Sequence, residues 1–244
     1  MATNASTPPA DSTLRVEPLG DQALLAILGE GIDPGVNDQV HHLAALIRAS
    51  ALPGLTDLVP AYATLAVHYD PAAWGAHGAP YEALRAELVR LWQGAGAADP
   101  PAPRHVEIPV CYGLEFGPDL EEVARICKLP AQEIIARHSG AEYRVYMLGF
   151  SPGFPYLGGL DPTIAAPRRE TPRTKVLAGS VGIAGMQTGI YPMDSPGGWQ
   201  LIGRTPRRLF RPGQEEPCLL RPGDRLHFVP VDLDTYRAFA EERP

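Results

Sequence analysis

The residues best suited to chemistry lie in the segment from Arg168 to Arg225. This segment carries ten basic and five acidic side chains, whereas the whole chain has a net charge of −7. The planar guanidinium group of arginine binds carboxylates and phosphates through two parallel hydrogen bonds. The segment therefore predicts an anion-binding site, and its candidate substrate-binding arginines are Arg168, Arg173 and Arg204.

Prolines beside two of these arginines favour the same interpretation. Pro167 and Pro172 each precede an arginine by one residue, and a proline fixes the local direction of the backbone. Glu170 lies between the two arginines, where its carboxylate could orient one guanidinium group. We expect the anion to be a substrate carboxylate or a phosphate, while a solvated arginine surface is the alternative.

Three further polar residues could act on a substrate. Gln187 and Thr188 offer hydrogen bonds to an amide or a carboxylate. His138 ends a predicted short helix and is the candidate catalytic residue, as an acid–base group near pH 7. A packing role at the helix terminus is the alternative for His138.

Standard catalytic and nucleotide motifs are missing. The chain has no GxxxxGK[ST] phosphate loop, no GxGxxG turn after a strand and no metal-ligand spacing among its seven histidines, so no metal site is predicted. Residues 178–182 (AGSVG) approach the GxSxG nucleophile elbow, but that elbow needs a following helix, which the downstream glycines forbid. We expect these glycines to form a nest of backbone amides for an anion rather than to present Ser180 as a nucleophile.

Apolar periodicity places these residues in a chain of two domains and an α+β fold. Strands within residues 14–28, a helix over 34–49, strands over 55–59 and 62–69 and a second apolar-faced helix predict a small α/β sandwich over residues 1–93. Asp33 and Pro34 supply the cap and first position of the first helix. Residues 94–104 carry no side chains that could pack a core, so they are the predicted linker.

The second domain, residues 105–244, changes character along its length. Strands are expected at 105–110 and 142–148, short helices at 118–127 and 130–138, and a last helix at 233–241. Between Gly149 and Gly223 there are 13 glycines and 11 prolines, a density that excludes long helices. This predicts a β-rich barrel with strands at 180–184, 199–202 and 225–229, whose core we expect to contain Phe150 and Trp199.

Composition excludes several classes of protein. A net charge of −7 argues against binding of nucleic acid, which needs a positive surface. No run of apolar residues is long enough to span a membrane, and the first residues do not form a secretory signal. Three widely spaced cysteines predict reduced thiols and a cytoplasmic protein.

Three blocks of sequence carry a family resemblance. They are GFSPGFPYLGGL at 149–160, AGSVGIAGMQTGIYP at 178–192 and SPGGWQLIGRTP at 195–206. In order and spacing they resemble the family of B-type subunits of 5-oxoprolinase, also described as allophanate hydrolase subunit 1 or as kinase-inhibitor-like proteins. At position 177 this chain has leucine where the family usually has proline. This difference loosens one turn and affects no expected chemistry.

The resemblance implies a small α/β domain followed by a cyclophilin-like β-barrel. It implies a subunit, inactive alone, of an ATP-dependent enzyme that opens 5-oxo-L-proline to L-glutamate. The implied partners are a larger homologous barrel subunit of the C type, with which it is similar to a carboxyltransferase domain, and a third hydrolase subunit of the A type. The resemblance leaves two alternatives, a histidine-kinase inhibitor and a subunit of an allophanate or urea-derivative amide hydrolase.

Overall fold

The computed structural model describes residues 14–77, 79–94 and 102–241. The chain divides into two compact units, Met1–Ala102 and Pro103–Pro244. The predicted linker over residues 94–104 falls mostly outside the described residues, so its exact limits stay a prediction.

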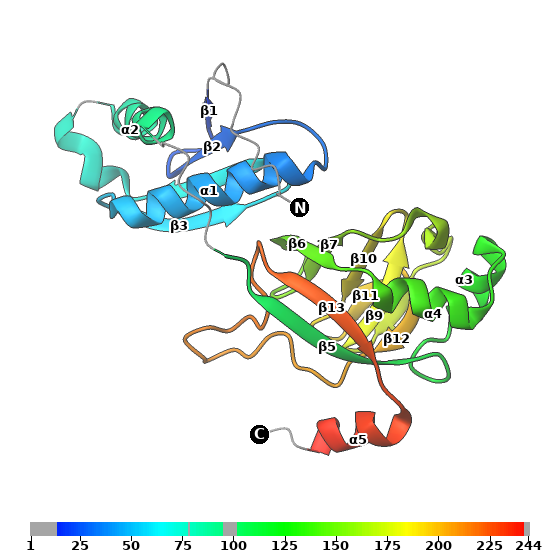
Figure 1. Cartoon of the computed structure of the whole chain (residues 1–244). Coiled ribbons are helices and arrows are strands. Elements are labelled where there is room, and N and C mark those ends of the chain that lie inside the picture. The colour runs from blue at the N-terminus through cyan, green and yellow to red at the C-terminus, as the bar shows by residue number, and fades with distance from the viewer. Residues whose placement is uncertain (1–13, 78, 95–101, 242–244) are drawn as a thin grey trace. The chain divides into compact units, whose positions relative to one another are not determined.

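The first unit is an antiparallel sheet with helices packed on it. The strand order is β1-β2-β4-β3 (Figure 1), with β1 at Arg15–Pro18, β2 at Ala23–Ile27, β3 at Leu55–Pro60 and β4 at Thr64–Tyr69. Helix α1 spans Pro34–Ser50, the 3₁₀ helix η1 spans Pro71–His77 and α2 spans Pro80–Gly94. The predicted order of two strands, a helix, two strands and a helix is confirmed, with η1 added before α2.

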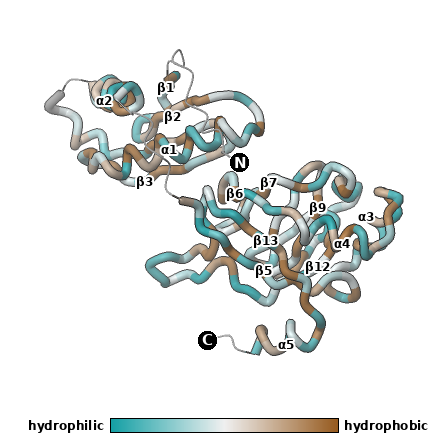
Figure 2. The backbone as a smooth tube through the Cα atoms, in the orientation of Figure 1, coloured by the Kyte–Doolittle hydropathy of each residue, from teal (hydrophilic) through white to brown (hydrophobic). Residues whose placement is uncertain are grey.

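Local sequence explains where α1 begins and which face it buries. The Asp33 carboxylate accepts a hydrogen bond from the Val36 amide at 2.8 Å, and a proline occupies the first turn. Along α1, hydrophobic and hydrophilic residues alternate at helical spacing (Figure 2). Its buried face, with Leu43 at its centre, shares one core with Leu65 of β4 and Leu88 of α2.

Seven strands of the second unit close into a barrel of order β10-β7-β6-β13-β5-β12-β9. Strands β5 and β13 run parallel and side by side (Figure 1), and the other ladders are antiparallel. The strands are β5 at His105–Tyr112, β6 at Tyr143–Leu148, β7 at Pro155–Gly158, β9 at Ser180–Ala184, β10 at Gln187–Ile190, β12 at Gln200–Arg204 and β13 at Arg225–Pro230.

The remaining elements cover the barrel and its ends. Helices α3 at Leu120–Cys127 and α4 at Ala131–Gly140 precede β6, and α5 at Leu233–Glu241 closes the described chain. A 3₁₀ turn η2 at Pro162–Ile164 and a two-stranded ribbon of β8 (Arg173–Val176) and β11 (Ser195–Gly197) complete the unit. The predicted α+β class, the barrel and the terminal helix are confirmed.

Phe150 and Trp199 have different environments. Trp199 is buried against Phe154 and Tyr191, as expected. Phe150 is 67% exposed and has a positive φ of 66°, so the prediction that it fills the core is wrong. Its backbone lies in a tight turn in which the Ser151 amide donates to the Gly149 carbonyl, and this turn directs the ring outward.

None of the described helices combines the length and the apolar character needed to cross a bilayer. All three cysteines, Cys111, Cys127 and Cys218, are free thiols.

Candidate functional site

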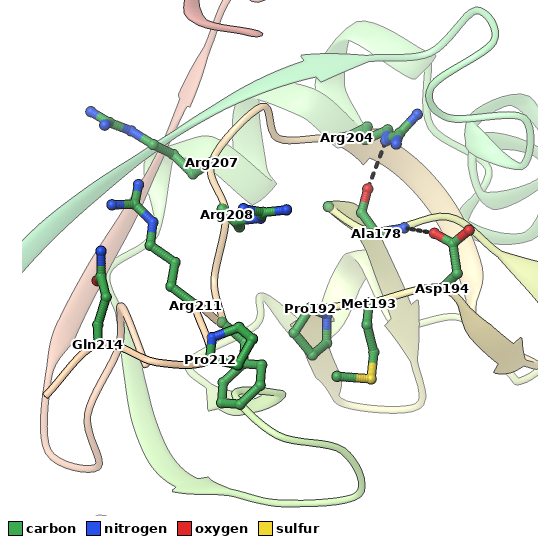
Figure 3. A pocket seen from close by; sticks show the side chains of 12 residues that line it. Ala178, Pro192, Met193, Asp194, Arg204, Arg207, Arg208, Arg211, Pro212 and Gln214 are labelled. Carbon is green, nitrogen blue, oxygen red and sulfur yellow. Dashed lines mark hydrogen bonds between the residues drawn. The ribbon is translucent and has the colours of Figure 1, made fainter. Parts of the chain in front are cut away.

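An arginine-lined cleft of about 690 Å³ opens on the barrel unit (Figure 3). Four stretches of chain contribute to it: the turn before β9, the residues after β10, the end of β12 and the loop that follows β12. Its lining residues are Ala178, Gly179, Pro192, Met193, Asp194, Arg204, Arg207, Arg208, Phe210, Arg211, Pro212 and Gln214.

Backbone hydrogen bonds around Gly179 hold three of these stretches together. The Gly179 amide donates to the Tyr191 carbonyl at 2.7 Å, and the Thr205 amide donates to the Gly179 carbonyl at 2.9 Å. Gly179 has a φ of +85°, and a Cβ atom there would collide with the Thr205 carbonyl oxygen. Only glycine fits this close approach without strain, so residue 179 fixes one wall of the cleft.

The same hydrogen bonds disprove the predicted amide nest. Gly179 uses its amide as described, the Ala178 amide donates to Asp194 Oδ1 at 2.9 Å, and the Ser180 amide donates to the Leu177 carbonyl at 3.1 Å. None of the three N–H groups is free for a ligand. Ser180 itself is buried within strand β9 rather than exposed on a strand-to-helix turn, in agreement with the rejection of a nucleophile elbow.

The charge of the cleft comes from arginines that lack carboxylate partners. Arg204 is anchored through Nε, which donates to the Ala178 carbonyl at 2.8 Å (Figure 3). Within the described part of the chain, Arg208 and Arg211 have no carboxylate within ion-pair distance, and Arg207 stacks over the Phe239 ring at 5.6 Å. These side chains can donate to an anion without first breaking an internal ion pair.

The carboxylate among the described residues that line the cleft, Asp194, is held mainly by groups other than the arginines, with Arg204 as a minor electrostatic partner. Its Oδ1 accepts from the Ala178 amide, and its Oδ2 lies 2.9 Å from Lys175 Nζ. The Ala178 amide and the Lys175 ammonium lower the pKa of Asp194, which is therefore ionised and already paired at neutral pH. The cleft keeps an excess of positive charge and can hold an anion.

Arg173 lies in a separate ion-pair cluster. Asp119, at the start of α3, is buried and accepts from both terminal nitrogens of Arg173 at 2.8 Å and from Arg169 Nη1 at 2.9 Å. Its Oδ2 also accepts from the Leu201 amide at 2.7 Å. The carboxylate that orients Arg173 is therefore Asp119 and not Glu170, which is exposed.

His138 and Thr188 meet inside the barrel. The Thr188 hydroxyl donates to the Gly182 carbonyl at 3.0 Å, so it accepts from His138 Nε2 at 2.9 Å. His138 Nδ1 then accepts from the Tyr112 hydroxyl at 2.8 Å. Burial lowers the pKa of His138 to about 3, so the imidazole is neutral at pH 7.

The six residues predicted from sequence therefore lie in different places. Arg204 lines the cleft, Arg173 belongs to the Asp119 cluster, and His138 with Thr188 lies in the barrel core. Arg168 is exposed near Tyr191, and Gln187 is half-buried at the start of β10. Sequence reasoning missed Arg207, Arg208 and Arg211, although four arginines within residues 204–211 were a visible signal. No group of three or more His, Cys, Asp or Glu side chains suited to a metal ion occurs among the described residues.

Comparison with known proteins identifies the family. The family model for the carboxyltransferase domain, subdomain C and D, matches residues 14–220. The chain is 48% identical to the B-type subunit of 5-oxoprolinase from Bacillus subtilis over 233 residues, which cover 93% of this chain and 97% of the relative. The chain belongs to the family of 5-oxoprolinase B-type subunits. The prediction made from the three sequence blocks is thereby confirmed.

Another member of this family and a solved structure agree. The chain is 54% identical to the B-type subunit of 5-oxoprolinase from Escherichia coli O157:H7 over 143 residues, covering 59% of this chain and 65% of the relative. The solved structure of TTHA0988 superposes with a TM-score of 0.74 at 40% identity, covering 86% of this chain. This chain spans only 40% of TTHA0988, which is therefore much longer.

Two of the three sequence blocks that mark the family contribute to the lining of the cleft. The block at 178–192 supplies Ala178, Gly179 and Pro192, and the block at 195–206 supplies Arg204. The other cleft arginines follow directly after the second of these blocks. These two blocks therefore supply part of the wall of the cleft and one of its arginines, as well as strands of the barrel.

Proposed function

We propose that this chain is a subunit of an ATP-dependent 5-oxoprolinase that opens 5-oxo-L-proline to L-glutamate. The observation that carries the proposal is its 48% identity to nearly the whole of a 5-oxoprolinase subunit of the B type. The positively charged cleft adds a physical reason, because both the substrate and ATP are anions.

The proposed reaction needs ATP because opening of the lactam is unfavourable by itself. The γ-phosphoryl group of ATP passes to the lactam oxygen, water adds to the activated carbon, and the C–N bond breaks while the nitrogen takes a proton. A second water hydrolyses the resulting acyl phosphate. The products are glutamate, ADP and inorganic phosphate. This chain carries no recognisable nucleotide motif, so its part in the reaction must come from other groups.

We assign different roles to the six residues predicted from sequence. Arg204 is the proposed anion-binding residue, since it lines the cleft and its Nε is anchored. Arg168 and Gln187 are proposed to contact substrate or a partner from the barrel surface. Arg173, Thr188 and His138 are proposed to act as positioning residues, because their polar groups are already bonded within the barrel unit.

The proposed complex contains a larger barrel subunit of the C type and a third subunit of the A type. The family name, which describes one subunit among several, implies such partners, and the length of TTHA0988 supports covalent or non-covalent association with a further module. We propose a cytoplasmic location, because three free cysteines suit a reducing compartment. No role for nucleic acid or a membrane enters the proposal.

Reconstitution tests the proposed function. The full chain should release no ADP in response to 5-oxoproline, whereas the mixture with its two partner subunits should do so and form glutamate. Allophanate should not replace 5-oxoproline in the same assay. Lactam-dependent ADP release by the chain alone, or by the mixture with allophanate only, would contradict the proposal.

A further inference from the structure

The arginines of the cleft differ from most other arginines of the described chain. Elsewhere, most described arginines are matched to a carboxylate, as in Arg104 with Asp224, Arg137 with Glu133 and Arg225 with Glu142. Among the described residues, the exposed Arg48 and Arg168 lie singly without such a partner. In the cleft, Arg208 and Arg211 face no carboxylate of the described residues, and Asp194, the acidic residue among those that line the cleft, is already paired with Lys175. Several guanidinium groups without carboxylate partners at one site indicate that the site binds an anionic ligand.

The number of arginines indicates a multiply charged ligand. One carboxylate group, such as that of 5-oxoproline, satisfies one guanidinium fork. Arg204, Arg207, Arg208 and Arg211 all line the same cleft, and the side chain of Arg208 points into it (Figure 3). A chain of phosphates presents anionic oxygens to several guanidinium groups at once. It therefore matches this arrangement better than a single carboxylate does.

The size and the apolar wall of the cleft indicate more than phosphate alone. A volume of about 690 Å³ lies within the range of small-molecule sites, roughly 300–1,000 Å³, and 5-oxoproline would leave most of it empty. Pro192, Met193, Phe210 and Pro212 supply apolar lining beside the arginines. A positively charged end next to an apolar wall suits a phosphate chain joined to a flat organic group.

We propose that this cleft binds a nucleotide through its polyphosphate chain, with the base against the apolar lining. The proposal rests on the proposed function in one respect, which is that the nucleotide is ATP. Here guanidinium groups replace the backbone amides of a phosphate loop, because the amides of residues 178–180 are used within the fold. This chain then holds the nucleotide of the complex even though it lacks a nucleotide motif.

Calorimetric titration of the full chain with ATP tests the site directly. Arg208→Ala and Arg211→Ala should each weaken ATP binding by roughly tenfold to a hundredfold, the range for loss of a charge-assisted contact. Arg208→Lys should recover little, since lysine lacks the planar fork. Arg48→Ala is the matched control, because Arg48 is an exposed arginine of the other unit, and it should bind ATP like the wild type.

Other ligands separate the possible sources of negative charge. Tripolyphosphate should compete with ATP but bind more weakly, and neither inorganic phosphate nor 5-oxoproline should displace ATP at matched concentration. Competition by 5-oxoproline, or equal affinity for tripolyphosphate and ATP, would overturn the nucleotide assignment. Unaltered ATP binding in both alanine variants would also overturn it.

The reconstituted complex separates this proposal from the proposed function. The two alanine variants should raise the Michaelis constant for ATP at least tenfold while the subunits still assemble in a pull-down. An active complex whose Michaelis constant for ATP is unchanged in both variants would refute nucleotide binding in the cleft and leave the proposed function intact. If the chain binds ATP but the complex is inactive on 5-oxoproline, nucleotide binding in the cleft would be supported and the proposed function refuted.

Discussion

Asp119 accepts a hydrogen bond from each terminal nitrogen of Arg173, with Oδ2 and Oδ1 both 2.8 Å from their donors. This bidentate pair joins the start of α3 to strand β8, which lie 54 positions apart in the sequence. The Leu201 amide and Arg169 occupy further acceptor positions on the same carboxylate. Asp119 is therefore a structural hub of the barrel unit.

Replacement of Asp119 should destabilise the protein strongly. Asp119→Ala leaves two guanidinium groups and one buried amide without their acceptor, and loss of one partner of a buried pair costs about 3 kcal/mol or more. Urea unfolding followed by circular dichroism measures the change in the free energy of unfolding. Asp234→Ala, which removes an exposed carboxylate of α5, is the control and should leave the midpoint unchanged. Equal stability of the two variants would contradict the structural role.

The same pair shows what sequence reasoning could and could not find. The residues near Arg173 suggested Glu170 as its partner, because a local pattern cannot reveal a carboxylate 54 positions away. Periodic features were predicted well: the cap of α1 and the strand β9 depend on neighbouring residues alone. The sequence left both a catalytic and a packing role open for His138 and wrongly placed Phe150 in the core, since burial of a helix-terminal histidine and exposure of a phenylalanine depend on tertiary packing.

The cleft was predicted in part for a similar reason. An arginine-rich segment indicated an anion site, and one of its candidate residues, Arg204, lines the cleft. Carboxylates that are distant in the sequence decide which arginines are free to bind a ligand. Arg173 is paired with Asp119, whereas Arg208 and Arg211 have no such partner among the described residues. Charge counting along the sequence cannot make that distinction.

Burial of His138 should make the protein sensitive to acid. The pKa of His138 is lowered to about 3 in the folded state by burial, against about 6.5 in an unfolded chain. The unfolded state therefore takes up a proton first, and stability falls as the pH decreases from about 6.5 towards 3. This residue alone should cost about 2 kcal/mol of unfolding free energy between pH 7 and pH 5.

The variant His138→Gln isolates this contribution. It should be less stable than the wild type at pH 7, because it disturbs the hydrogen bonds with Thr188 and Tyr112. The difference between the two proteins should shrink at pH 5, where only the wild type carries the protonation penalty. Urea unfolding at pH 7 and pH 5 measures the difference in unfolding free energy between the two proteins. A difference that stays constant with pH would show that His138 titrates normally in the folded protein.

The junction of the two units should be the first site of proteolysis. Residues 94–104 offer small side chains and prolines with no apolar anchor, and such segments are preferred sites of cleavage. Brief digestion with subtilisin, followed by mass spectrometry, should give fragments that end between Gly94 and Arg104. First cuts within residues 34–49 or 178–192 would contradict this, because helix α1 and the ladder of β9 and β10 protect those residues.

The wall of the cleft should depend on glycine at position 179. An alanine there must adopt the φ of +85° and also avoid the Thr205 carbonyl oxygen, so Gly179→Ala should push the turn before β9 away from the end of β12. Gly185→Ala is a matched control, since Gly185 has a φ of +59° with open space around its Cβ position. The control carries only the conformational cost of a positive φ, about 1 kcal/mol. Unfolding free energies should therefore fall clearly further in Gly179→Ala than in Gly185→Ala, because only the first adds a collision with backbone. Equal losses would show that the hydrogen bonds between residues 179, 191 and 205 tolerate the displacement and that this glycine is needed for its backbone freedom alone.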